Sequence, residues 1–317
     1  MRLAKVSGIL TAGFPLWLLL GCAWAWGRPD DWAWFRPYIS IALGVVMLGM
    51  GLTLRFSDFA AVLKDPKRIA LGVFAQFLIM PLLGWSLAKA FQLEAGLALG
   101  LILVACCPGG TVSNVICHLA RANVPLSVLM TMTSTMTAVF ATPWLTRWLA
   151  GAWMPVDAFA LFKSMVIVVL LPLLLGIAVN TLLGKMRDAR KAREWIDALG
   201  PLVSALVVVA IVGCIVAGEK DKIAMAAGPL FMSVFLLHGC GFFLGYFFAK
   251  LAGCGESLRR TISIEVGMQN SGLGAALASK HFPQIAMAPV PAAISAVFHS
   301  IIGSCLAAWW RKRGEDS

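Results

Sequence analysis

Residues 108–114 read Pro-Gly-Gly-Thr-Val-Ser-Asn, and residues 265–272 read Glu-Val-Gly-Met-Gln-Asn-Ser-Gly. Each motif interrupts an apolar stretch that is long enough to cross a bilayer, at about 95–119 and about 258–281. Proline and glycine favour breaks in a helix. Irregular backbone at membrane depth is tolerated only inside protein or beside a wet cavity. The two motifs therefore predict a pair of interrupted transmembrane helices.

Apolar stretches dominate the rest of the chain. Sixty per cent of the 317 residues are hydrophobic and 13% are charged, whereas soluble domains are about half apolar and a quarter charged. About 20 apolar residues cross a bilayer, and this criterion predicts an all-α integral membrane protein. Its ten predicted spans are 8–26, 37–55, 69–91, 95–119, 124–150, 157–184, 199–217, 226–252, 258–281 and 286–310. The charged segment 56–68 is typical of an interfacial connector.

The net charge of +11 is a signal of topology. The basic residues lie in short turns between apolar stretches, which is not the pattern of a nucleic-acid-binding face. With a cytoplasmic N-terminus, eighteen Lys and Arg residues fall on the cytoplasmic side and seven on the other. This bias predicts that both termini are cytoplasmic, in a bacterial inner membrane. Residues 1–26 also resemble a signal peptide, but the apolar run is long and the repeat described next favours a retained span.

Ten spans divide into two sets of five, and an odd number per set makes the second set enter from the opposite side. We therefore expect one transporter domain over 1–317, built from inverted repeats at about 1–150 and 157–310. The two broken spans occupy corresponding places, since Asn114 and Asn270 are 156 residues apart. Secondary transporters of this kind bind substrate and ions near the midplane, at such breaks.

Glu265 is the most informative residue, because it lies inside an apolar span between Ile264 and Val266. A charged carboxylate at the centre of a span costs about 2.5–3.5 kcal/mol. The alternative is a surface glutamate that pairs with Arg259 or Arg260, but these precede it by about two turns. No Lys or Arg lies at comparable depth, so a hard cation is the expected partner.

Several neutral oxygen ligands lie at a depth that matches Glu265. They are Ser113 and Asn114 at the first break, Ser127 and Thr131 on one face of the next span, Gln76 in the third span, and Gln269 one turn beyond Glu265. Sodium binds such oxygens together with carbonyls freed by an unwound helix. For the hydroxyl groups, interhelical hydrogen bonding is the alternative.

The breaks also predict where a substrate binds. Each break leaves the N-terminus of a half-helix, whose N–H groups attract anions. Thr111 and Asn270, at the breaks, are the candidates for touching a small organic anion. Among the histidines, the intramembrane His299 is the best placed to approach it.

These motifs resemble the bile acid:sodium symporter family, in particular its bacterial ten-helix members. Met50-Gly51-Leu52-Thr53-Leu54 and Ala141-Thr142-Pro143 add to the resemblance, which covers nearly the whole chain. It implies a core of spans 3–5 and 8–10 that moves against a panel of spans 1, 2, 6 and 7, with spans four and nine crossing at their breaks.

The resemblance also implies two sodium sites. The first consists of Ser113, Asn114, Ser127, Thr131 and Glu265, and the second consists of Gln76, Glu265, Val266, Met268 and Gln269. Val266 and Met268 supply backbone carbonyls. The implied reaction is symport of two sodium ions with one organic anion, bile acid-like or pantoate-like, with membrane lipid as surroundings and no protein partner implied.

Three other functions fit the sequence less well. A proton-coupled carrier of the same fold would use Glu265, but the oxygen-rich surroundings favour sodium. An intramembrane enzyme would need a nucleophile–base pair or a metal cluster, and no such constellation or Cys/His metal spacing is visible. A passive channel would not need the inverted repeat. The sequence therefore predicts a carrier and not an enzyme.

Overall fold

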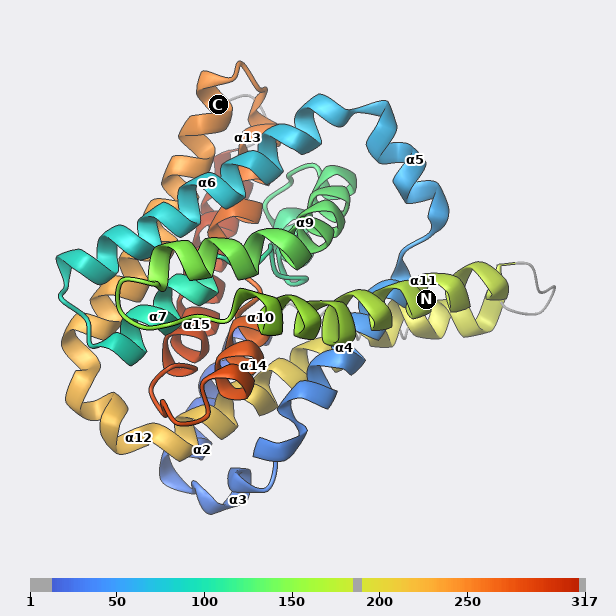
Figure 1. The fold of residues 1–317 in the computed structure, drawn as a ribbon. Coiled ribbons are helices and arrows are strands. Elements are labelled where there is room, and N and C mark those ends of the chain that lie inside the picture. The colour runs from blue at the N-terminus through green and yellow to red at the C-terminus, as the bar shows by residue number, and fades with distance from the viewer. Residues whose placement is uncertain (1–12, 185–189, 314–317) are drawn as a thin grey trace.

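The computed structural model describes residues 13–184 and 190–313, and within these ranges the chain is helical without a strand (Figure 1). The first half contains α2 (Phe14–Gly27), α3 (Asp30–Ala33), η1 (Arg36–Tyr38), α4 (Ile39–Thr53), α5 (Phe56–Lys64), α6 (Pro66–Ala90), α7 (Ala95–Ala105), α8 (Ser113–Leu119) and α9 (Val124–Ala150). The second half contains α10 (Ala158–Ser164), η2 (Met165–Leu170), α11 (Leu171–Leu183), α12 (Arg190–Leu251), α13 (Glu256–Gly267), α14 (Ser271–His281) and α15 (Val290–Arg313).

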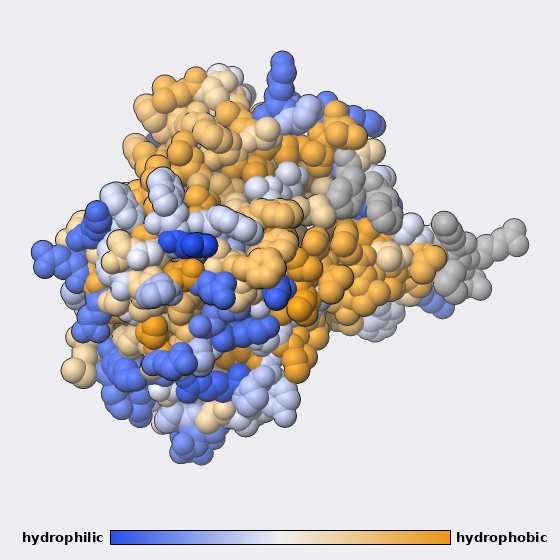
Figure 2. All heavy atoms as spheres, viewed as in Figure 1, coloured by the Kyte–Doolittle hydropathy of each residue, from blue (hydrophilic) through white to orange (hydrophobic). Residues whose placement is uncertain are grey.

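The outer surface is that of a membrane protein. Six helical stretches in the described ranges are long and apolar enough to span a bilayer, and α2 and α7 are shorter apolar helices. Large side chains point outward without protein cover, among them Trp148 and Phe243, which are 75% and 67% exposed. Figure 2 shows an apolar surface over much of the molecule, with polar residues gathered at the lower left of the view and a smaller group at the top. An apolar surface of this extent marks a multi-pass membrane protein.

The seventh and eighth predicted spans both lie in α12, where two helices meet at a kink. A straight helix of 62 residues would measure about 90 Å, three times the thickness of the hydrocarbon core, so the kink divides α12 into two lengths that can each cross a bilayer. The backbone leaves helical geometry at Glu219, where α12 bends, as Figure 1 shows at the lower left. The Glu219 carboxylate is 3.6 Å from Arg36 and 3.1 Å from Lys222, so ion pairs hold the bend.

Two further elements depart from a plain series of spans. The predicted span 157–184 contains a π-helical turn, η2, directly before Pro172. Proline lacks the N–H group of a regular turn and crowds the preceding one, which explains the wider turn. The predicted connector 56–68 contains the short helix α5. The start of the first predicted span, and of the possible signal peptide, lies outside the described residues.

The helices pack in two groups. In one group, α4 packs against α11 and α12, and α2 packs against α12. In Figure 1, α4, α11 and the yellow part of α12 extend together to the right. In the other group, α6 packs against α7 and α9, and α15 packs against α12 and α14. Small residues allow close approach within each group. A Cβ on Gly51 of α4 would overlap the Leu173 carbonyl of α11, and one on Gly245 of α12 would lie 3.0 Å from Val266 of α13.

Candidate functional site

The two interrupted helices meet at their breaks. The segment between α7 and α8 runs antiparallel to the segment between α13 and α14, with Gly109 opposite Gln269. The Gly110 N–H donates to the Met268 carbonyl at 3.0 Å, and the Asn270 N–H donates to the Pro108 carbonyl at 2.8 Å. These bonds satisfy backbone groups that the broken helices leave free, as membrane depth requires.

Glycine is required at this crossing because the segments approach closely. A Cβ on Gly109 would lie 2.9 Å from the Glu265 carboxylate, and a Cβ on Gly110 would lie 2.9 Å from the Gln269 carbonyl. Contacts this short would push the two segments apart. The glycines of the first motif therefore bring the backbone against Glu265.

Three hydroxyl groups from two other helices surround the Glu265 side chain, which is 2% exposed. Ser113 of α8 and Ser127 of α9 each donate to Oε1 at 2.5 Å. Thr131, one turn further along α9, donates to Oε2 at 2.8 Å. The predicted first set of ligands thus comes together at one carboxylate, through contacts of α13 with α8 and α9.

In this cluster, the hydroxyl groups have more nearby acceptor oxygens than they have protons to donate. Ser127 Oγ lies 2.5 Å from Glu265 Oε1 and 2.8 Å from Asn114 Oδ1, although one hydroxyl proton can serve only one of them. Thr131 Oγ1 likewise lies within hydrogen-bond distance of Glu265 Oε2 and the Ser127 carbonyl. A cation attracts oxygen atoms without needing their protons. The arrangement therefore suits a positive ion among these oxygens.

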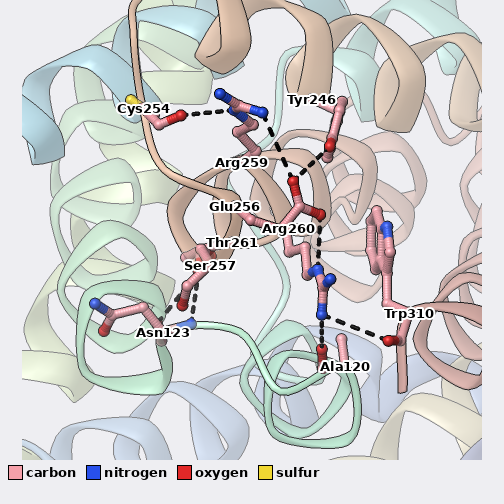
Figure 3. Close-up of polar contacts among 10 residues, drawn as sticks. All are labelled: Ala120, Asn123, Tyr246, Cys254, Glu256, Ser257, Arg259, Arg260, Thr261 and Trp310. Carbon is pink, nitrogen blue, oxygen red and sulfur yellow. Dashed lines mark hydrogen bonds and ion pairs between the residues drawn. The ribbon is translucent and has the colours of Figure 1, made fainter. Parts of the chain in front are cut away.

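The arginines that precede Glu265 do not compensate its charge. Arg259 and Arg260 both pair with Glu256, at 3.8 and 2.8 Å (Figure 3). Across residues 13–184 and 190–313, no ion pair reaches Glu265. The surface-pairing interpretation of Glu265 is therefore wrong.

A second group of oxygens lies around Gln76 and Gln269. The Gln76 amide donates to Gln269 Oε1 at 2.9 Å and to the Cys107 carbonyl at 3.0 Å, and the Gln269 amide donates to the Val266 carbonyl at 3.1 Å. Gln76 Oε1 is buried and has no hydrogen-bond partner within the part of the chain that the structure describes. Leaving a buried acceptor unsatisfied costs about 1–3 kcal/mol, so this oxygen is available to a cation. Met268, the remaining predicted ligand, has its carbonyl at the crossing.

The donor atoms of both groups are oxygens. The described part of the chain contains no cluster of three or more His, Cys, Asp and Glu residues that could hold a metal ion. Hydroxyl, amide and carboxylate oxygens favour hard cations over zinc or copper. Both groups therefore suit a hard cation such as sodium.

A cavity of about 200 Å³ lies beside the crossing, between α4 and α12 on one side and α8 and α9 on the other. Its lining consists of Gly49, Met50, Thr53, Leu54, Thr111, Val112, Asn114, Val115, Val128, Gly200, Pro201 and Ser204. Thr111, predicted to touch substrate, is therefore at a cavity. Thr53 and Ser204, which line the opposite wall, were not among the predicted substrate residues, although Thr53 belongs to the segment Met50–Leu54 that carries part of the resemblance.

The other two predicted substrate residues lie elsewhere. The Asn270 side chain accepts from the Leu273 N–H at 3.1 Å and so begins α14. His299 is 4% exposed, and its ring lies 5.3 Å from that of His238. Neither residue lines the 200 Å³ cavity.

Broken helices that cross inside a membrane protein, with oxygen clusters at the crossing, define the class of ion-coupled carriers. Residues 40–226, more than half of the chain, match the sodium bile acid symporter family. The chain belongs to this family, which confirms the resemblance seen in its motifs.

Relatives from bacteria and plants have names that are consistent with this family. The chain is 41% identical over 310 residues to a Bacillus subtilis (strain 168) protein named uncharacterized sodium-dependent transporter YocS, covering 98% of this chain and 94% of the relative. It is 44% identical to the rice protein (Oryza sativa subsp. japonica) named probable sodium/metabolite cotransporter BASS1, chloroplastic, covering 98% and 75%. The Arabidopsis thaliana protein of the same name is 40% identical, with 97% and 75% covered.

Proposed function

We propose that this protein is a secondary active transporter that couples the inward movement of sodium ions to the uptake of a small organic anion. The observation that carries the proposal is the cluster around Glu265, a buried carboxylate that has three hydroxyl groups around it and no cation from residues 13–184 or 190–313. A sodium ion would neutralise the carboxylate. It would also be coordinated by the oxygen atoms that cannot all receive a hydrogen bond at the same time. Membership of the family and the names of the relatives support the same function.

Two sodium ions share Glu265 in this proposal. The first takes the hydroxyl side, with Ser113, Asn114, Ser127 and Thr131. The second takes the Gln76 side, where the unpartnered Gln76 Oε1 supports it, with Gln269 and the carbonyls of Val266 and Met268. Both ions depend on one negative charge, so we expect their binding to be cooperative.

The transport cycle follows from the two groups of helices. We assign α6–α9, α13–α15 and the second part of α12 to a core, and α2, α4, α10–α11 and the first part of α12 to a panel. Together they form ten spans in two inverted repeats, with both termini in the cytoplasm of a bacterial inner membrane. Movement of the core against the panel would expose the crossing to each side in turn, which is alternating access.

The substrate would occupy the space between core and panel. The cavity there combines apolar side chains with Thr111 and Asn114, which suits an organic anion with an apolar body. Asn270, at the start of α14, would approach the substrate when the core moves, and His299 would do so from behind the crossing. Bile acid-like and pantoate-like anions both fit this description.

The test is uptake by proteoliposomes that contain the purified protein. Radiolabelled taurocholate and pantoate would be offered with an inward sodium gradient, with potassium in its place, and with a proton gradient in sodium-free buffer. We expect uptake of at least one anion only with sodium. Uptake driven equally by the proton gradient would instead support the proton-coupled carrier. A Glu94→Gln variant, changed at an exposed glutamate, is the matched control for changes at Glu265.

A further inference from the structure

The cytoplasmic end of α13 carries a buried cation that reaches two other helices. Arg260 is 1% exposed and pairs with Glu256 through Nε at 2.8 Å. Its Nη1 lies 3.4 Å from the carbonyl of Ala120, the C-cap of α8, and 3.5 Å from the carbonyl of Trp310 in α15 (Figure 3). A cation at the C-terminal carbonyls of a helix is favourable. One side chain therefore joins α13 to α8 and α15.

The next residue joins α13 to the beginning of α9. Thr261 Oγ1 accepts from the Asn123 backbone N–H at 2.9 Å and donates to the Ser257 carbonyl at 2.8 Å. Asn123 is the N-cap of α9, where its side chain accepts from the Leu126 N–H. The turn between α8 and α9 is thus attached to α13 at both of its ends.

The backbone of that turn shows that it is held in place. Arg121 has φ +53°, in the left-handed region, where helices usually end with glycine. That region is unfavourable for an L-residue with a side chain. Such a conformation persists where its surroundings fix it, and the contacts of Arg260 and Thr261 lie on either side of it.

We propose that Arg260 and Thr261 are positioning residues that set the sodium affinity of the Glu265 cluster. They lie five and four residues before Glu265 on α13, between one and one and a half turns away. They fasten the two helices that bring Ser113 and Ser127 to its carboxylate. Ligands held in place before an ion arrives bind it more tightly, and residues behind the ligands commonly change metal affinity when they are replaced. This inference rests on the proposed sodium site.

Neighbouring residues supply matched controls. Arg259 also pairs with Glu256, but it donates to the Cys254 carbonyl, and within the described residues we find no bond from Arg259 to α8 or α15. Arg259→Lys is therefore the control for Arg260→Lys, which keeps the charge but loses the branched reach of the guanidinium. Thr261→Ser keeps the hydroxyl and is the control for Thr261→Val.

The experiment measures binding of radioactive sodium to the purified full-length protein, together with the melting temperature. We expect Arg260→Lys and Thr261→Val to raise the half-saturating sodium concentration about three- to tenfold without changing the number of ions bound. Arg259→Lys and Thr261→Ser should stay within about twofold of the wild type.

The inference is overturned if Arg260→Lys and Thr261→Val bind sodium with the wild-type half-saturation, even where the melting temperature falls. It is also overturned if Arg259→Lys weakens binding as much as Arg260→Lys. If Arg260→Lys does not fold, the comparison of Thr261→Val with Thr261→Ser decides. Absence of sodium binding by the wild type would instead contradict the proposed function.

Discussion

Two glutamates on α13 have opposite surroundings. Glu256, at the N-terminal end of α13, pairs with Arg259 and Arg260 and accepts from the hydroxyl of Tyr246 at 2.6 Å (Figure 3). Glu265, nine residues later, is more deeply buried and accepts from the neutral hydroxyl groups of Ser113, Ser127 and Thr131. Among the described residues, cations surround the first carboxylate and none pairs with the second.

The difference between the two glutamates indicates what kind of partner Glu265 requires. A buried charge is stable when it is paired and hydrogen-bonded. At Glu256 the partners belong to the same helix, so this end of α13 can serve as a fixed attachment. In the proposed function, the partner of Glu265 is an ion that arrives and leaves. A coupling site would need this property, because a built-in arginine would compete with the transported cation.

Removing the negative charge of Glu265 is the strongest test of this comparison between the two glutamates. Glu265→Gln should reduce sodium-driven uptake by about 100-fold or more, because both ions lose their shared carboxylate. The folded state should persist, since the amide keeps the size and one carbonyl oxygen. Proteoliposome uptake and a melting curve would be measured together.

The same substitution at Glu256 shows how much of the effect is specific to Glu265. Glu256→Gln should retain sodium-driven uptake, with a higher half-saturating sodium concentration. Near-normal uptake by a folded Glu265→Gln protein would remove the role assigned to this carboxylate.

Membrane potential should act on the complete cycle. Two sodium ions and one monoanion carry a net charge of +1, and 100 mV is worth about 2.3 kcal/mol for that charge, or about 50-fold in the accumulation limit. Taurocholate, whose sulfonate stays ionised, is the suitable substrate. An inside-negative potential should raise its accumulation at fixed sodium and equal pH, and indifference to potential would argue for one sodium ion.

The Gln76 side of the crossing should contribute less than the shared carboxylate. Gln76→Leu removes the amide oxygen that has no partner in the structure, so we expect one sodium ion to be lost. Uptake at limiting sodium should fall about tenfold, and the Hill coefficient for sodium should approach one. An unchanged Hill coefficient with lower stability would mean that Gln76 only connects α6 to the crossing.

Thr131→Ala should have the smallest effect. It removes one neutral oxygen from the hydroxyl side, and one hydrogen bond or ligand of this kind is worth about 1 kcal/mol. The half-saturating sodium concentration should rise about fivefold, while uptake at saturating sodium stays near normal. If only the melting temperature changes, the hydroxyl is an interhelical packing contact.

Much of the site could be predicted from the sequence because its parts carry strong local signals. Proline and glycine motifs inside apolar stretches indicated the breaks after Ala105 and Gly267, and both are present. An isolated carboxylate in an apolar span indicated Glu265. The structure then brings Ser113, Ser127 and Thr131 to it, as expected.

Other features depend on contacts between distant segments, which no local pattern encodes. The kink of α12 at Glu219 is accompanied by an ion pair with Arg36, far away in the chain. The wall of the cavity that contains Thr53 and Ser204 forms only when α4 and α12 pack beside α8. The π-helical turn before Pro172 is a local response to proline whose form the sequence does not specify.

Equilibrium binding of sodium to the purified protein, without substrate, tests the central claim most directly. The wild type should bind two sodium ions per chain, and Glu265→Gln should bind neither with measurable affinity. Glu94→Gln should match the wild type, which separates the buried carboxylate from glutamates in general. A wild-type protein without saturable sodium binding, or a Glu265→Gln protein that binds sodium as the wild type does, would contradict the account.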